Sequence, residues 1–226
     1  MNVDILGHHS SIMQTEMERG MSKRIVGYEE MRKKVSDIVY GSNPNPHIWL
    51  DTGCGTGGLV RENLERFPRT QFILSDPSED SISVAKEYMH GEQRCLYVQR
   101  RTDELNFGDS TLDVVTAILC HHYYQDIGEK RKAIENCFRM LRKGGVLITA
   151  EHVRHEDQDT ADEEWLAHMR SSGLSEEFAQ EMIDRRDKEY FPLTEGAHVE
   201  LLKACGFSEV RVFWSTCSDI GIVAVR

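Results

Sequence analysis

The sequence predicts an α/β protein built on a doubly wound, mostly parallel seven-stranded sheet. Short apolar runs alternate with amphipathic segments from residue 46 onward, which is typical of parallel strands joined by right-handed helical crossovers. The last two apolar runs are separated by only a few residues, 216–219, and so short a connection requires an antiparallel pair. At 226 residues, the chain is expected to form one domain with an inserted cap.

The first elements are expected in a regular order. An amphipathic helix is predicted over 24–40, after a polar stretch at 1–22 that is interpreted as a mobile arm or a loose first helix. The prolines and glycine of 41–46 end this helix. Strands are then predicted at 48–52, 71–76, 95–100, 112–119 and 146–153, with helices between them at 57–67, 77–91 and 129–145.

A charged helical segment interrupts the alternation at 154–190. Its apolar side chains recur at helix spacing, which predicts a cap over one edge of the sheet. A helix at 195–207 and strands at 209–215 and 220–226 complete the sheet. We therefore divide the single domain into an N-terminal arm and lid helix (1–45), a ligand-binding core (46–153), a helical cap (154–195), and the last helix with the antiparallel strand pair (196–226).

Composition excludes several function classes. The 38 acidic residues outnumber the 27 Lys and Arg, and a formal charge of −11 disfavours a nucleic-acid partner. The six cysteines are scattered without a CxxC pair, which argues against a zinc knuckle or a disulfide framework and favours the reducing cytoplasm. No apolar run approaches the roughly 20 residues that span a bilayer, so no membrane partner is expected. A homodimer is compatible with the sequence.

A glycine-rich turn follows the first predicted strand. Gly53, Gly55 and Gly58 satisfy the pattern G-x-G-x-x-G, which is typical of nucleotide sites but does not by itself identify the ligand. Asp51 precedes this turn, and a carboxylate there repels a phosphate but attracts an ammonium or a sulfonium. Asp76 ends the next strand, where an acidic side chain can accept both hydroxyls of a ribose. The pattern favours a cationic nucleoside without phosphates, such as S-adenosylmethionine.

These motifs resemble those of the class I S-adenosylmethionine-dependent methyltransferases, over residues 48 to about 150. LDTGCGTG is similar to the first motif of the family, SDPSEDSISVAKE to its ribose-binding motif, and LRKGGVLI to the turn and strand after its fourth helix. The resemblance implies that Asp51 faces the methionine amino group and that Asp76 takes the ribose hydroxyls. It also implies that Gly53, Cys54 and Gly55 line the cofactor, with Pro77 and Ser78 beside the adenine.

The adenine contact departs from the family pattern. Many members have an Asp after the third strand, where this sequence has Arg101. Asp103 is one candidate for the contact, and the backbone of Thr102 is the other. In the lid helix, Arg24 and Tyr28 are candidates to cover the cofactor, although both also suit a plain structural role.

The segment after the fourth strand, LCHHYYQD, is expected to reach the same rim as the glycine turn, and its Leu119 is expected to line the cofactor. His121 and His122 are candidate general bases because imidazole titrates near neutral pH, and Tyr123 is a candidate to shape the pocket. Packing against the sheet is an equally good explanation of these histidines. No metal is predicted, since the spacing of Cys120, His121, His122 and His152 does not support a ligand set.

Four functions remain open. The leading hypothesis is a methyltransferase acting on a small molecule, since the cap and the HHYYQD stretch resemble small-molecule members of the family. The alternative is an enzyme that modifies the sulfonium itself, because the RIVGYEEM helix resembles that of carboxy-S-adenosylmethionine synthases. The other two hypotheses are a non-catalytic cofactor-binding or regulatory subunit and a nicotinamide dehydrogenase.

Overall fold

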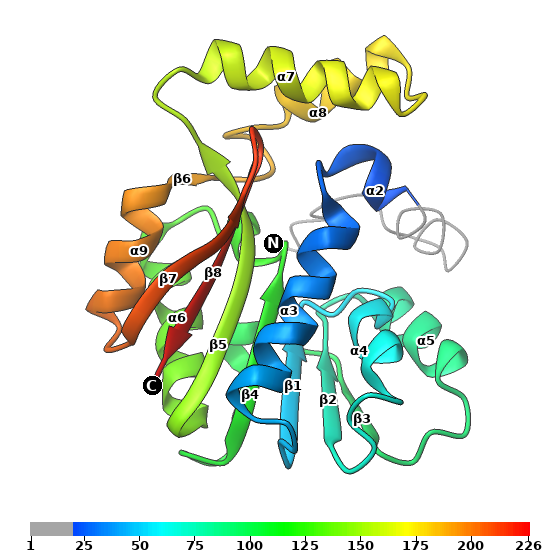
Figure 1. The fold of residues 1–226 in the computed structure, drawn as a ribbon, viewed down its shortest axis with the longest axis vertical. Coiled ribbons are helices and arrows are strands. Elements are labelled where there is room, and N and C mark those ends of the chain that lie inside the picture. The colour runs from blue at the N-terminus through cyan, green and yellow to red at the C-terminus, as the bar shows by residue number, and fades with distance from the viewer. Residues whose placement is uncertain (1–19) are drawn as a thin grey trace.

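The computed structural model describes residues 20–226, so nearly all of the predicted N-terminal arm lies outside the described residues. Its sheet has the strand order β3-β2-β1-β4-β5-β8-β7, and β8 runs antiparallel to both of its neighbours, β5 and β7, while the other described pairs in this order are parallel (Figure 1). The doubly wound, mostly parallel sheet is therefore confirmed. The strands are β1 Ile48–Thr52, β2 Gln71–Ser75, β3 Cys95–Val98, β4 Leu112–Ile118, β5 Leu141–Arg154, β7 Ser208–Ser215 and β8 Asp219–Val225.

An eighth strand, β6, was not predicted. It comprises only Leu193–Thr194 and pairs with the end of β5. The helices are α2 Met21–Arg24, α3 Tyr28–Ser42, α4 Gly58–Asn63, α5 Glu79–Tyr88, α6 Ile127–Met140, α7 Gln158–Ser171, α8 Glu176–Asp184 and α9 Glu195–Ala204, with single 3₁₀ turns η1 Thr102–Glu104 and η2 His121–Tyr123.

Helices cover both faces of the sheet (Figure 1). Side chains alternate along β1, so that Trp49 packs into the apolar cluster under α3, α4 and α5 while Leu50 packs into the cluster under α6 and α9. Both side chains are fully buried. Burial on both faces explains why the central strands are continuously apolar rather than alternating.

The predicted helix over 24–40 corresponds to α3, which starts later than expected and is preceded by the separate short helix α2. α2 ends at Arg24 and α3 begins at Tyr28, with Gly27 between them at a φ of +69°. A left-handed residue cannot continue a right-handed helix, and glycine adopts that conformation without strain. The prediction was wrong here because the apolar spacing continues across the break.

The boundary between α6 and β5 also differs from the prediction. The helix was expected to extend to the glycines at 144 and 145, but it ends at Met140. Leu141 already pairs with Leu112 of β4, and a register irregularity separates that pair from Val114 and Val146. The glycines therefore lie within the irregular start of the strand instead of closing a helix.

The cap helices α7 and α8 lie across the carboxyl end of the sheet, beside α2, rather than along one edge (Figure 1). Only three residues separate the end of β5 from the start of α7, and this short link keeps α7 at the carboxyl end of the strand. Trp165 and Met169 of α7 pack with Met182 of α8 and with Tyr190 in a separate apolar cluster. Within residues 20–226, no helix is both long enough and apolar enough to cross a membrane.

Candidate functional site

The glycine turn joins β1 to α4 and requires glycine at two positions for different reasons. Gly53 has a φ of +63°, and a Cβ there would lie 2.3 Å from the Cβ of Cys120. Gly55 has a φ of +53°, but a Cβ there would meet no atom within 4 Å. The backbone at Gly55 thus borders open space in which a ligand can approach. Within this turn, the third glycine with a positive φ is Gly57, whereas the sequence pattern has Gly58 as its third glycine.

Asp51 lies at the end of β1 and is 2% exposed. Its Oδ1 accepts a hydrogen bond of 2.6 Å from the hydroxyl of Thr116 on β4. Burial raises the pKa of Asp51 to about 7, with Thr116 and the charge of Arg32 opposing the rise and nearby Asp76 adding to it. A buried carboxylate with this pKa is stabilised when a cation binds beside it.

Asp76 follows β2 directly and is 9% exposed. Its Oδ2 accepts the backbone N–H of Gly55 at 2.9 Å, and its Oδ1 accepts that of Ser78 at 2.9 Å. Burial raises the pKa of this carboxyl, and the two backbone donors lower it. Asp76 therefore joins the glycine turn to the start of α5, and the side chain of Ser78 caps that helix. Beside it, Pro77 is exposed and Cys54 is half-buried, its N–H donating to the carbonyl of Ser75.

The turn η1 carries both candidates for the adenine contact. The buried hydroxyl of Thr102 lies 2.7 Å from that of Thr52. Asp103 is half-buried and accepts hydrogen bonds from Arg101 Nε at 3.1 Å and from the Tyr124 hydroxyl at 2.8 Å. Arg101, which replaces the expected acidic residue, thus holds the neighbouring carboxylate in place.

The chain reaches the glycine turn again after β4. Leu119 has a φ of +56°, which is unusual for a residue other than glycine, and its N–H donates to the carbonyl of Ala150 at 2.7 Å. Cys120 then contacts Gly53, and its thiol donates to the carbonyl of Thr52 at 3.3 Å. The sequence prediction that this segment meets the rim of the glycine turn is confirmed by these contacts.

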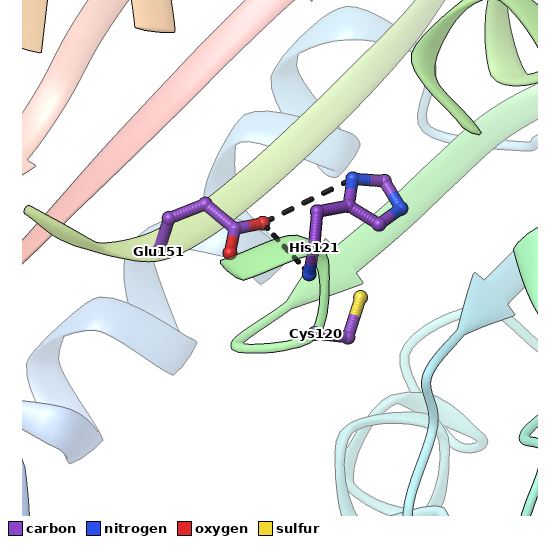
Figure 2. Close-up of side chains that lie close together, drawn as sticks. All are labelled: Cys120, His121 and Glu151. Atoms are coloured by element: carbon purple, nitrogen blue, oxygen red, sulfur yellow. Dashed lines mark hydrogen bonds and ion pairs between the residues drawn. The ribbon is translucent and has the colours of Figure 1, made fainter. Parts of the chain in front are cut away.

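The turn η2 is tied to Glu151 of β5 (Figure 2). The Glu151 side chain is 2% exposed and accepts the backbone N–H groups of His121 at 3.3 Å and His122 at 2.8 Å. Burial would raise the pKa of Glu151, but the side-chain hydrogen bond and charge of His122, together with the charges of His121 and His198, outweigh it and hold the pKa below its usual value. Both histidines are buried, and burial lowers the pKa of each.

Cys120, His121 and Glu151 offer ligand atoms that lie within 4.8 Å of one another (Figure 2). Hydrogen bonds within the protein already account for this group, because the thiol donates to Thr52, a ring nitrogen of His121 contacts Thr102 and Glu151 accepts several donors. We assign no metal to it.

Tyr123 and Arg24 both lie close to the cap helix α7. Tyr123 packs against the apolar cluster of α7 and α8, and burial raises its pKa while the charges of Arg185 and Arg24 lower it. The indole N–H of Trp165 donates to the backbone carbonyl of Arg24 at 2.6 Å. Tyr28 lies farther along the same segment, where its hydroxyl accepts a hydrogen bond of 3.0 Å from Arg32.

A cavity of about 590 Å³ lies elsewhere, between the start of α7 and the turn that joins β7 to β8. It contains none of the predicted site residues. The residues that line it are His155, Glu156, Asp157, Thr160, Ala161, Glu164, Ser215, Thr216 and Cys217.

Comparison with known proteins finds similar sequences and structures among methyltransferases. A family model described as a methyltransferase domain matches residues 50–147. The carboxy-S-adenosyl-L-methionine synthase of Idiomarina loihiensis is 24% identical over 221 residues, covering 91% of this chain and 87% of that protein. Human N-acetylserotonin methyltransferase, solved in complex with SAM, has a TM-score of 0.65 at 14% identity and covers 96% of this chain and 56% of that chain.

Residues 50–147 thus resemble the class I S-adenosylmethionine-dependent methyltransferases, and the similar solved structures confirm the predicted fold. These matches agree with the predicted family and cofactor. The ubiquinone/menaquinone biosynthesis C-methyltransferase UbiE of Vibrio campbellii is 29% identical over 130 residues, covering 55% of this chain and 48% of that protein. The matched part thus spans about half the length of that relative, and the assignment of individual site residues stays a prediction.

Sequence reasoning missed several residues that hold the candidate site together. Thr116 bonds Asp51, Arg32 lies near it, and Lys130 donates to the carbonyl of His121 at 2.9 Å. All three are buried polar side chains on other elements. A polar residue within an apolar strand or helix face was the signal, and it stands out at Thr116 in LDVVTAIL.

Proposed function

We propose that this chain transfers the methyl group of S-adenosylmethionine to a small-molecule acceptor. The observation that carries the proposal is the pair of buried carboxylates, Asp51 and Asp76, on neighbouring strands on either side of a glycine turn whose Gly55 faces open space. Negative charge at both strand ends suits an ammonium, a sulfonium and two ribose hydroxyls, and it opposes a pyrophosphate.

In this proposal Asp51 binds the α-amino group and Asp76 the ribose hydroxyls. Gly53, Cys54, Gly55 and Leu119 line the methionine and ribose, while Pro77, Thr102 and Asp103 meet the adenine. Arg24 and Tyr28 lie on the N-terminal side of the pocket. The proximity of Asp51 to Asp76, the half-exposure of the turn and the positions of Tyr123 and Arg24 against the cap support this placement.

The acceptor would lie between η2, α2 and the cap, with His121, His122 and Tyr123 as the catalytic candidates. The acceptor atom attacks the methyl carbon in line, the bond from that carbon to sulfur breaks, and its electron pair stays on sulfur to give S-adenosylhomocysteine. The protein's part is to hold the two reactants in contact and to exclude water. The cap over the carboxyl end of the sheet supports such an enclosed site.

A second candidate is modification of the sulfonium itself. The match to carboxy-S-adenosyl-L-methionine synthase covers 91% of this chain, including the lid region, whereas the UbiE match covers 55%. Both candidates use the same cofactor site and differ only in what reacts under the cap.

Mass spectrometry separates the two candidates. The purified protein is incubated with S-adenosylmethionine and a panel of small alcohols, phenols, amines, thiols and carbon acids, and separately with a bacterial metabolite extract. The proposal predicts S-adenosylhomocysteine together with a methylated acceptor. A sulfonium heavier than S-adenosylmethionine would support the second candidate, and binding without any product would leave only the cofactor-binding role.

Location and partners belong to the same proposal. All six cysteines are free thiols, which supports a reducing compartment such as the cytoplasm. The net charge of −11 supports a small-molecule partner over nucleic acid. The homodimer stays a prediction that light scattering would test.

A further inference from the structure

The two histidines of η2 occupy different hydrogen-bonding environments. Nε2 of His121 lies 3.1 Å from the hydroxyl of Thr102, and its Nδ1 lies 3.9 Å from Glu151. Nδ1 of His122 lies 3.0 Å from the Glu151 carboxylate. Nε2 of His122 is buried and has no hydrogen-bond partner among the described residues. Nε2 is therefore engaged by Thr102 in His121, whereas in His122 the same nitrogen has no hydrogen-bond partner among the described residues.

Glu151 is held in a single orientation. Its Oε1 accepts a hydrogen bond of 2.7 Å from the hydroxyl of Thr149, and its two oxygens accept the N–H groups of η2. With its pKa below the usual value, the carboxylate stays ionised at neutral pH. An ionised, fixed carboxylate next to an imidazole selects the tautomer that carries the proton on Nδ1.

One contact competes for that nitrogen. The backbone N–H of His152 points at Nδ1 of His122 from 3.4 Å, which would favour the opposite tautomer. The carboxylate contact is shorter and carries a full negative charge, so it dominates. His122 therefore presents the lone pair of Nε2 away from Glu151.

We propose that His122 is the general base of the transfer and that Glu151 is the positioning residue that fixes its tautomer. The inference rests on the proposed function and deepens it, because it chooses between two neighbouring candidates. His121 then serves the cofactor side, through Thr102 and Thr52, rather than the acceptor.

The surroundings of His122 suit this role. Its ring centroid lies 4.4 Å from those of Tyr123 and His152, and 6.1 Å from that of Tyr190, all beneath the cap. Burial lowers the pKa of His122, and His152 and Lys130 lower it further, so the imidazole is neutral at physiological pH. Glu151 opposes these effects and stabilises the imidazolium once a proton arrives.

The proton and the electrons balance in one step. The acceptor X–H gives its proton to Nε2 of His122 as a lone pair of X forms the bond to the methyl carbon. The bond from carbon to sulfur breaks and leaves its electron pair on sulfur. His122 is then an imidazolium paired with Glu151, and it returns the proton to solvent when the product leaves.

Nitrogen-15 NMR of the whole chain tests the tautomer without any acceptor. We expect His122 to show a protonated Nδ1 and an Nε2 with a free lone pair at neutral pH. In Glu151→Gln, whose fold is checked by the amide spectrum, this preference should fall. A wild-type His122 protonated on Nε2 would overturn the proposal, and so would a tautomer unchanged in a folded Glu151→Gln.

Kinetics with the best acceptor of the panel test the base. His122→Gln should lower kcat about 10²- to 10⁴-fold at saturating S-adenosylmethionine, with the Kd of S-adenosylhomocysteine changed less than threefold. His121→Gln should lower kcat less and weaken the cofactor more. If His122→Gln keeps kcat within tenfold of wild type, or if His121→Gln loses more, the assignment is wrong. If no acceptor of the panel is methylated, the proposed function is wrong. The NMR experiment would still determine the tautomer of His122, so the two failures can be told apart.

Discussion

Asp51 is expected to couple ligand binding to protonation. Its carboxylate has a pKa of about 7 because burial disfavours the charge, and the hydrogen bond from Thr116 offsets only part of this effect. A bound ammonium would favour the ionised form. The affinity for S-adenosylmethionine should therefore rise with pH through the region around 7.

Asp51→Asn separates this effect from others. In the wild-type protein we expect the affinity for S-adenosylmethionine to increase from pH 6 to pH 8, and in Asp51→Asn we expect weak binding that does not change over this range. Isothermal titration calorimetry at both pH values measures the affinity of each protein for S-adenosylmethionine. An equal pH dependence in the two proteins would show that another group is responsible.

The stability of the free protein should fall as pH rises, opposite to the affinity for S-adenosylmethionine. A carboxyl whose pKa is raised in the folded state stabilises the fold below its unfolded value of 3.8, and that contribution is lost as pH rises towards 7. The free energy of unfolding should fall by up to about 1.4 kcal/mol per pH unit in this window because of Asp51. Urea titrations at pH 5 and pH 7 measure this change, and the Asp51→Asn protein should lack the contribution of Asp51 to it. An equal fall of the unfolding free energy in both proteins would contradict this prediction.

Sequence spacing alone was enough to propose residues for the constant part of the ligand. Asp51, the glycines and Asp76 follow one another at fixed spacing after strands, so a local pattern locates them. Thr116 and Glu151 reach the site from strands far along the chain, and only tertiary packing brings them there. Which of His121 and His122 faces the acceptor is likewise a matter of side-chain contacts that spacing does not encode.

At the scale of elements, the glycine turn offers a matched pair of substitutions. Both Gly53→Ala and Gly55→Ala place a side chain at positive φ, which costs about 1–2 kcal/mol. At Gly53 the new Cβ also meets Cys120, so this variant should lose clearly more stability. At Gly55 it enters open space, so the variant should stay folded but bind S-adenosylmethionine more weakly. Denaturation and calorimetry on the pair test this, and equal losses of stability would refute it.

The cap is tied to the N-terminal helices through Trp165, which is 2% exposed and donates to Arg24. Trp165→Phe keeps most of the packing but loses the hydrogen bond, which should cost about 1 kcal/mol. Trp165→Ala should cost about 3–5 kcal/mol and expose α2 to protease. Thermal unfolding and limited proteolysis measure both variants, and an α2 as resistant in Trp165→Ala as in the wild type would disprove the connection.

Element boundaries were predicted less well than element order. Apolar spacing passes unbroken through Gly27, yet the backbone turns there, and LRKGG reads as a helix end although Leu141 already pairs with β4. In both places a long-range contact or a special dihedral decides the structure. Local periodicity carries no record of either.

For the whole molecule, alternation of strands and helices predicted the doubly wound sheet, and the short connection at 216–219 predicted its antiparallel β8. The placement of the cap across the carboxyl end of the strands was not predicted, because it follows from the short link between β5 and α7 and from packing against α2. The sequence does not identify the acceptor for a similar reason, since the cap proposed to surround it has no fixed motif.

The central claim is that two buried carboxylates at neighbouring strand ends hold a cationic adenosine derivative. Calorimetric titration of S-adenosylmethionine into the wild-type protein and into Asp76→Ala tests it most directly, with urea titration to establish that the variant is folded. We predict one binding site per chain in the wild type and an affinity weaker by a few kcal/mol, at least tenfold, in Asp76→Ala. No heat with the wild type, or the same Kd in both proteins, would contradict the claim.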